Sequence, residues 1–251
     1  MAITIAFALQ KGGVGKSTTA ETVAAILSSR GGKRVLLVDM DCQMNVTFIS
    51  GAEPEKTITD VFTGEADPKD AICHCKYYDL LAADEYLANL ERTEDIETTL
   101  LKDVLAAVQD DYAYILIDTP PSLGNCLKNS LMASDYVLIP TDARPLSIKG
   151  LDALEPTLNA VKVVSSRFKV LGAVLVKYNE RTVLNRQIRE LLTERVAEMG
   201  TILFDTTIRE GIAVAEAQAM QTSLIDYAPK SKPCQDYEML TYEILQRIKG
   251  E

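Results

Sequence analysis

The chain has 251 residues, of which 47% are hydrophobic and 25% charged. This length and composition are typical of a globular protein with one α/β domain. No run of 18 apolar residues occurs, so we expect no transmembrane helix. The net charge of −10 argues against a protein whose whole surface binds nucleic acid.

Cysteine usage indicates a reducing compartment. None of the cysteines forms a CxxC pair, and His74 is the only histidine, so the pattern does not fit a structural zinc site. Free thiols are typical of intracellular proteins. The first residues lack a basic leader followed by an apolar segment, so we expect a cytoplasmic location.

Short apolar runs alternate along the chain with stretches typical of helices. The expected strands are Ile3–Leu9, Arg34–Asp39, Asp79–Ala82, Tyr114–Asp118, Tyr136–Thr141 and Val170–Val176. The expected helices are Thr18–Arg30, Thr98–Val108, Ser147–Val163 and Thr182–Met199. This alternation predicts an α/β fold, a mainly parallel twisted sheet with helices on both faces. No repeat or linker separates these elements, so we expect a single domain over residues 1–251.

A glycine-rich segment lies between the first expected strand and the first expected helix. It reads Lys11, Gly12, Gly13, Val14, Gly15, Lys16, Ser17 and Thr18. The glycines let backbone amides point inward and form an anion-binding concavity at the helix N-terminus. Lys16 is placed for the β- and γ-phosphates and the Ser17 hydroxyl for Mg²⁺. The strand–loop–helix setting therefore predicts the phosphate loop of a P-loop NTPase, with Lys11 in place of the usual first glycine. The simpler interpretation, a glycine-rich turn with a solvated lysine, does not explain that setting.

Three aspartates stand where expected strands end. Asp39 and Asp41 close the second strand, and Asp118 closes the strand Tyr114–Asp118. Ligands of open α/β sheets bind at the carboxyl ends of the strands. We therefore expect Asp39 and Asp118 to hold Mg²⁺ through water and Asp41 to orient an attacking water. Any one of these aspartates alone could instead cap the following turn.

The ordered motifs resemble a known family. KGGVGKSTT, VLLVDMDCQMNVT, ILIDTPPSLG and VLIPTDARPLSIKGL are similar to segments of the ParA/Soj branch of the deviant Walker A ATPases, which also include MinD. The resemblance continues through LGAVLVKYNERTVLNRQI and DTTIREGIAVAEAQAM, so it spans nearly the whole chain. It implies an ATPase that binds ATP and Mg²⁺ and forms an ATP-sandwich homodimer.

The same resemblance implies roles and partners. Lys11 matches the signature lysine that reaches the partner's nucleotide, Asp41 the water-orienting aspartate, and Gln43 and Asn45 the adjoining switch segment. In this family the ATP-bound dimer binds DNA without sequence preference. A ParB-like centromere-binding protein then stimulates a weak hydrolysis, and the cycle segregates plasmids or chromosomes. The resemblance therefore implies a nucleoid-associated protein.

Two segments depart from the family pattern. The switch segment, usually DPQGN, reads DCQMN at residues 41–45. In the segment 206–219, Glu210 and Ala213 stand where relatives carry arginines. Each lost phosphate contact weakens DNA binding, so DNA binding by this chain is in doubt. The remaining candidates for DNA contact are Lys177, Arg181, Arg186, Arg189 and Arg209.

Three alternative functions remain at this stage. A MinD-like positioning ATPase would act on a membrane surface or on cargo other than DNA, and on a membrane it needs a lysine-rich amphipathic tail. The apolar spacing of the tail 238–251 instead fits a helix packed on its own domain, and we expect no membrane contact. A nitrogenase-reductase-like protein needs two cysteines per chain for an iron–sulfur cluster, and only Cys126 lies near such a position. A non-enzymatic scaffold would not need the lysines and aspartates named above.

Overall fold

The computed structural model describes residues 1–93 and 97–250. In these residues the chain forms an eight-stranded sheet of order β3-β4-β2-β5-β1-β6-β7-β8. The strands are β1 (Ile3–Phe7), β2 (Val35–Asp39), β3 (Ile72–His74), β4 (Asp79–Leu81), β5 (Tyr114–Asp118), β6 (Tyr136–Thr141), β7 (Lys169–Tyr178) and β8 (Leu203–Arg209). All neighbours pair in parallel except β3, which is antiparallel to β4. The predicted fold class is confirmed.

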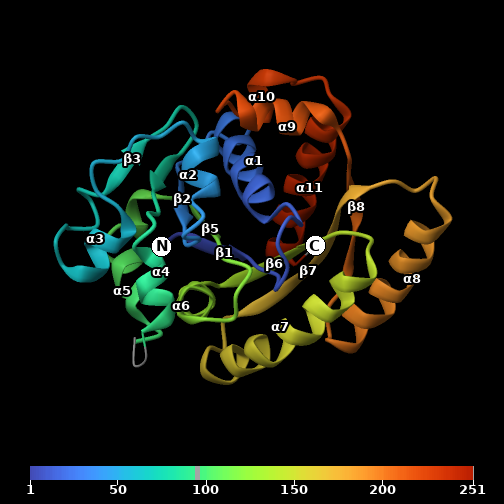
Figure 1. The fold of residues 1–251 in the computed structure, drawn as a ribbon, viewed down its shortest axis with the longest axis horizontal. Helices are drawn as coiled ribbons and strands as arrows, with labels where there is room; N and C mark the ends of the chain where they lie inside the picture. Colours follow the sequence, from blue (N-terminus) through green and yellow to red (C-terminus); the bar gives the residue numbers. More distant parts are fainter. Residues whose placement is uncertain (94–96, 251) are drawn as a thin grey trace.

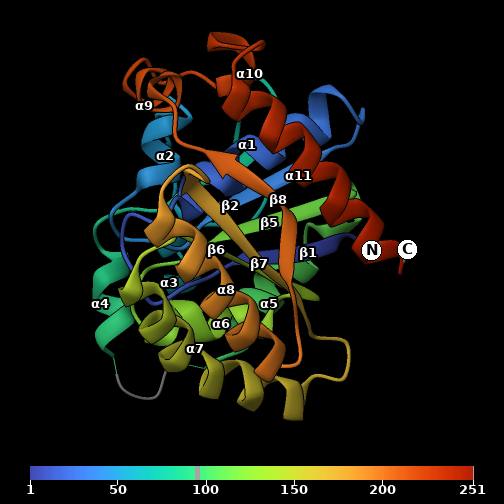
Figure 2. The same ribbon diagram turned by 90° about the vertical axis from the view of Figure 1, so that its right-hand side faces the viewer.

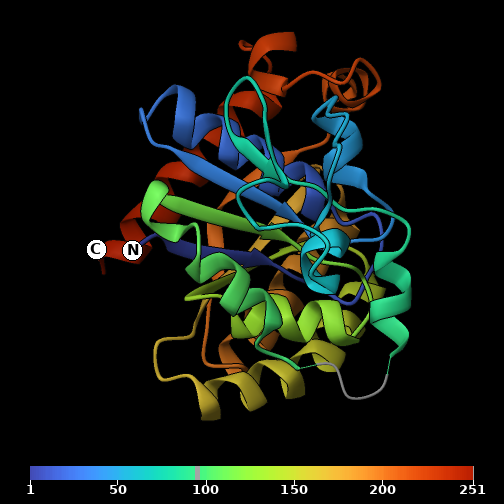
Figure 3. The ribbon, with the colours of Figure 1, turned by 90° about the vertical axis from the view of Figure 1, so that its left-hand side faces the viewer.

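Helices cover both faces of this sheet (Figure 1). They are α1 (Lys16–Ser29), α2 (Asn45–Ile49), α3 (Ile58–Thr63), α4 (Leu87–Arg92), α5 (Leu100–Ala106), the short 3-10 helix η1 (Gln109–Asp111), α6 (Asn125–Met132), α7 (Pro145–Val164), α8 (Val183–Glu198), α9 (Ile212–Ala219), α10 (Leu224–Tyr227) and α11 (Lys232–Lys249). Helices α1 and α11 pack on one face, and α5, α6, α7 and α8 on the other (Figures 2 and 3). Because strands β1, β2 and β5 have apolar residues on both sides, they bury both faces.

The strand order places the glycine-rich loop at the centre of the sheet. Strand β1 lies between β5 and β6, and the loop leaves its carboxyl end. In the β2–β5 pair Asp39 is directly opposite Asp118, and in the β1–β5 pair Phe7 is opposite Asp118. The strand-end carboxylates therefore lie at the same edge as the loop.

Several elements were not predicted. The edge strands β3 and β8 and the short helices α2, α3, α4, α6, α9 and α10 have no counterpart among the sequence-based expectations. The expected helix Thr98–Val108 is shorter, at Leu100–Ala106. Strand β8 carries polar residues on its exposed side, so its sequence lacks a continuous apolar run.

The C-terminal segment folds as expected into a helix on its own domain. In α11, Tyr237, Leu240 and Ile244 are buried against the sheet and α1, whereas Met239 is exposed. In the described part of the chain no helix has the length and apolar character needed to cross a membrane.

Candidate functional site

The loop between β1 and α1 has the backbone of an anion cradle. Gly13 and Gly15 have φ of 74° and 76°, in the left-handed region that favours glycine. A Cβ on Gly12 or Gly13 would meet open space. No side chain caps the N-terminus of α1, so its first amides are available to an anion.

Lys16 is buried in this cradle. Only 6% of it is exposed, and its Nζ donates to the carbonyl oxygen of Lys11 at 3.3 Å. Burial lowers the pKa of Lys16, while the charges of Asp118 and Asp41 oppose that shift. The Lys16 ammonium is therefore largely shielded from water and lies near the carboxylates of Asp41 and Asp118.

Asp39 and Asp118 form a buried carboxylate pair next to the loop, and both are fully buried. Asp39 accepts hydrogen bonds from the amides of Asp41 (3.1 Å) and Thr47 (2.9 Å) and from the Thr47 hydroxyl (2.9 Å). Within the described residues neither carboxylate oxygen of Asp118 has a hydrogen-bond partner. Buried polar groups are normally paired, so this orphaned carboxylate fits a cation or its water shell.

The electrostatics of this pair fit the same interpretation. Burial raises the pKa of Asp39 to about 6, although three hydrogen bonds oppose the shift. Burial also raises the pKa of Asp118 well above its ordinary value and the charge of Asp39 adds to the shift, while the nearby Ser17 side chain and the charge of Lys16 oppose it. Two adjacent buried carboxylates that resist ionisation are typical of a site that is completed by a bound cation.

Asp41 lies at the same edge of the sheet. It is buried, and one carboxylate oxygen accepts a hydrogen bond from the Gln43 amide at 3.0 Å. Burial raises the pKa of Asp41, and this hydrogen bond and the charge of Lys16 oppose the shift. Gln43 and Asn45 are exposed beside it, as expected for a segment that contacts a ligand or partner. The structure thus brings Lys16, Asp41 and the carboxylate pair together.

Lys11 is bound by its own chain. Its Nζ donates to Asp142 Oδ1 at 2.5 Å and to Ser147 Oγ at 3.0 Å, and Ser147 also donates to Asp142. Arg144 Nε lies 3.3 Å from the other Asp142 oxygen. Sequence reasoning missed Asp142 and Ser147. The available signal was the position of Asp142 directly after β6, at the carboxyl edge that carries the other aspartates.

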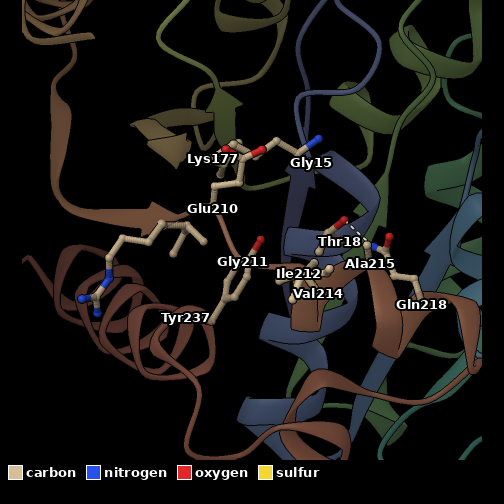
Figure 4. A pocket seen from close by; sticks show the side chains of 13 residues that line it. Gly15, Thr18, Lys177, Glu210, Gly211, Ile212, Val214, Ala215, Gln218 and Tyr237 are labelled. Carbon is tan, nitrogen blue, oxygen red and sulfur yellow. Dashed lines mark hydrogen bonds between the residues drawn. The ribbon is translucent and has the colours of Figure 1, made fainter. Parts of the chain in front are cut away.

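A cavity of about 450 Å³ opens beside the loop (Figure 4). Its lining comes from the loop and α1, the ends of β7 and β8, helix α9 and Tyr237 of α11. Across it, Gln218 Nε2 donates to Thr18 Oγ1 at 2.6 Å. Sequence reasoning named Gly15, Thr18, Lys177, Arg209 and Glu210 from this lining and noted the segment 206–219, but it did not predict that they line one cavity. Their meeting depends on contacts between distant segments, which no local motif encodes.

Two of the five candidate DNA contacts lie at this cavity. Lys177 Nζ donates to the Gly13 carbonyl at 3.0 Å. Arg209 makes a bidentate ion pair with the buried Asp236, at 2.8 and 2.6 Å. Lys177 and Arg209 are thus both engaged in contacts within the chain.

The other three candidates lie at and just before the N-terminal half of α8. Arg181 and Arg186 are exposed, and Arg186 donates to the Glu180 carbonyl at 2.8 Å. The Arg189 guanidinium lies 5.8 Å from the centre of the Tyr178 ring. Arg186 and Arg189 lie on α8 and Arg181 just before it, and none of these three forms an ion pair with a carboxylate within the described residues.

Comparisons with known proteins agree with this geometry. The family model described as an AAA domain matches residues 2–170. The chromosome-partitioning ATPase Soj of Thermus thermophilus is 34% identical over 98% of this chain and 96% of its own length. The chromosome partitioning protein ParA of Caulobacter vibrioides is 32% identical over 97% of the chain and 94% of its own length. The cobyrinic acid a,c-diamide synthase of Mycobacterium smegmatis, solved with ADP and magnesium, has a TM-score of 0.84 at 30% identity and covers 100% of this chain and 97% of its own.

Proposed function

The chain belongs to the ParA/Soj family of P-loop ATPases, and from this premise we propose that it is a DNA-partitioning ATPase driven by Mg²⁺ and ATP. One observation carries the proposal. Lys16 and the orphaned Asp118 carboxylate lie together under a loop whose amides form an anion cradle. This arrangement is the one that phosphoryl transfer needs, because that reaction depends on positioning and on stabilisation of charge.

ATP would occupy the loop and the adjoining cavity. Residues Gly12 to Thr18 supply amides and Lys16 a cation for the phosphates. The cavity begins at Gly15 and Thr18, where the loop would leave the α-phosphate, so the nucleoside would extend toward α9. A volume of about 450 Å³ accommodates a small ligand of this size.

Ser17, Asp39 and Asp118 are the residues that would hold Mg²⁺. The ion, when bound, supplies positive charge to the phosphate oxygens. The hydrogen bonds from Thr47 and from the Asp41 amide fix the Asp39 carboxylate in place. Asp41 would orient the attacking water, since it lies at the same edge and keeps one oxygen free of the Gln43 bond.

In this proposal ATP hydrolysis requires a homodimer, because Lys11 acts on the nucleotide of the partner chain. As the signature lysine it would contact the nucleotide of a second copy of the chain. It must first leave Asp142 and Ser147, which hold it in the single chain. Intrinsic hydrolysis would therefore be slow, and a ParB-like partner would accelerate it.

DNA is the proposed matrix of the dimer, and Arg181, Arg186 and Arg189 are the proposed contacts, so the protein would associate with the nucleoid. Three arginines per chain give six per dimer, so log affinity should fall with log salt at a slope of roughly −5. The membrane-surface alternative is not favoured, because Tyr237, Leu240 and Ile244 of α11 are buried in the core.

Nucleotide-dependent DNA binding tests this function. We expect a nonspecific DNA duplex to bind the protein with ATP and Mg²⁺ but not with ADP. Replacing Arg181, Arg186 and Arg189 with glutamine should abolish this binding and leave ATP hydrolysis without DNA unchanged. If the triple variant still binds DNA like the wild type, the proposed DNA contacts are wrong. If the wild type shows no Mg²⁺-dependent ATP hydrolysis, the ATPase proposal is wrong.

A further inference from the structure

Lys177 has an unusual backbone conformation. Its φ is 53°, in the left-handed region that residues with a Cβ rarely adopt. It is the second-last residue of β7 and lies directly beside the phosphate loop. Strained backbone of this kind is concentrated at functional sites. A physical reason for the strain should therefore lie in what the side chain contacts.

The side chain reaches the loop itself. Lys177 Nζ donates to the Gly13 carbonyl at 3.0 Å, and Figure 4 shows the extended side chain pointing toward the loop at Gly15. The preceding residue, Val176, is buried, and a Cβ on Gly15 would lie 3.4 Å from its Cγ2. Val176 thus sets β7 against the loop, and the left-handed residue after it directs an ammonium across the loop.

The Gly13 carbonyl is a weak partner for this cation. Among residues 1–93 and 97–250, no carboxylate oxygen lies within 4.0 Å of Lys177 Nζ. A charged oxygen binds an ammonium about twice as strongly as a neutral carbonyl does. An anion bound in the loop would therefore compete successfully for Lys177.

We propose that Lys177 is a phosphate contact of the nucleotide site: its ammonium exchanges the Gly13 carbonyl for a phosphate oxygen of the bound nucleoside di- or triphosphate. This inference rests on the proposed function and replaces the expectation that Lys177 contacts DNA. The Lys177–Gly13 bond ties β7 to the loop. In the occupied site the same side chain covers the phosphates at the mouth of the cavity.

Calorimetric titration with ADP and with a slowly hydrolysed ATP analogue, both with Mg²⁺, tests the inference. Lys177→Met should weaken binding of both about 10-fold at low salt, and less at high salt. Lys177→Arg should recover most of the loss. Lys177→Gly should show the same loss while suiting a φ of 53°, so its fold is not at risk. Lys169→Met, which removes an exposed cation at the opposite end of β7, should bind nucleotide like the wild type.

The outcomes separate this inference from the function on which it rests. If the wild type binds nucleotide and Lys177→Met binds within twofold of it at low salt, the inference alone is wrong. It is also wrong if Lys177→Met loses affinity for a DNA duplex at saturating nucleotide while its nucleotide affinity is unchanged. A wild type that binds neither nucleotide overturns both proposals.

Discussion

Replacing Asp118 with asparagine should stabilise the nucleotide-free protein and remove its response to Mg²⁺. Asp118 is fully buried opposite Asp39 and accepts no hydrogen bond from the described residues. Asparagine keeps the shape of the side chain, removes the charge and adds amide protons that can face the Asp39 carboxylate. The substitution therefore removes a buried, unpaired carboxylate that destabilises the protein when no cation is bound.

The size of this effect follows from the neighbouring carboxylate. Burial raises the pKa of Asp39 from 3.8 to about 6 despite three hydrogen bonds, which corresponds to roughly 3 kcal/mol when it ionises in the folded state. Asp118 is equally buried, and burial raises its pKa well above the ordinary value, so its ionised form is also destabilising in the folded state. An unsatisfied buried polar group typically costs about 1–3 kcal/mol, so we expect Asp118→Asn to stabilise the protein by roughly 2 kcal/mol at pH 7.5.

The dependence on pH has a definite sign. A carboxyl whose pKa is higher in the folded than in the unfolded state binds protons more tightly when folded. Folding stability therefore falls as the pH rises from the unfolded-state pKa through the folded-state pKa, and the loss is complete above the latter. The wild type should thus gain stability when the pH is lowered from 7.5 to 5.5, and Asp118→Asn should gain less.

Urea unfolding at these two pH values, without metal and then with Mg²⁺ and ADP, measures the effect. The variant's midpoint at pH 7.5 should rise by roughly 1 M without ligand. Mg²⁺ should add to the stabilisation by ADP in the wild type and not in the variant. Asp110→Asn, at a side chain that is 89% exposed, is the control and should change neither value. A variant less stable than the wild type at pH 7.5, or one with an undiminished Mg²⁺ effect, would refute this reasoning.

Four further substitutions test other parts of the account. Lys16→Ala should abolish nucleotide binding in calorimetry, because it removes the buried cation of the cradle; affinity like that of the wild type would contradict this role. Asp41→Ala should bind ATP but slow single-turnover hydrolysis at least about 10-fold, so that an ATP-bound dimer accumulates; rapid turnover would exclude Asp41 as the water-orienting group. Burial raises the pKa of Glu21 from 4.5 to about 7, so the stability of the wild type falls as the pH rises through that range. In urea unfolding, Glu21→Gln should therefore stabilise the protein by roughly 3 kcal/mol at pH 8 and by little at pH 4.5. An equal effect at both pH values would contradict the raised pKa. Gly172→Ala should lower the melting temperature by about 5 °C, because Gly172 has a φ of 148° and the new Cβ would lie 2.7 Å from both the Ile202 carbonyl and the Phe204 ring. An unchanged melting temperature would show that the strand adjusts at no cost.

The centre of the fold and the position of the site could be predicted because their signals are local. Buried parallel strands are continuous apolar runs, and the glycine-rich loop follows the first of them. The rule that ligands bind at the carboxyl ends of strands places Asp39, Asp41 and Asp118 near that loop. The structure confirms that they lie together, while their roles in hydrolysis stay predictions.

The remaining features depend on contacts between distant parts of the chain. Lys11 meets Asp142 across 131 residues, and Lys177 meets Gly13 across 164. No local pattern encodes either pair. Strand β8 and helix α9, which line much of the cavity, lack a clear periodicity because one is a partly exposed edge strand and the other buries little of its surface. The left-handed backbone of Lys177 likewise reflects its tertiary setting rather than its residue type.

Sedimentation velocity with ATP, with ADP and without nucleotide, each with Mg²⁺, tests the central claim most directly. In the proposed cycle Lys11 leaves Asp142 to contact a second copy's nucleotide, so the chain should sediment as a dimer with ATP and as a monomer in the other two states. Asp41→Ala should make the ATP dimer persist. A protein that binds ATP and stays monomeric would contradict the claim that ATP drives dimerisation.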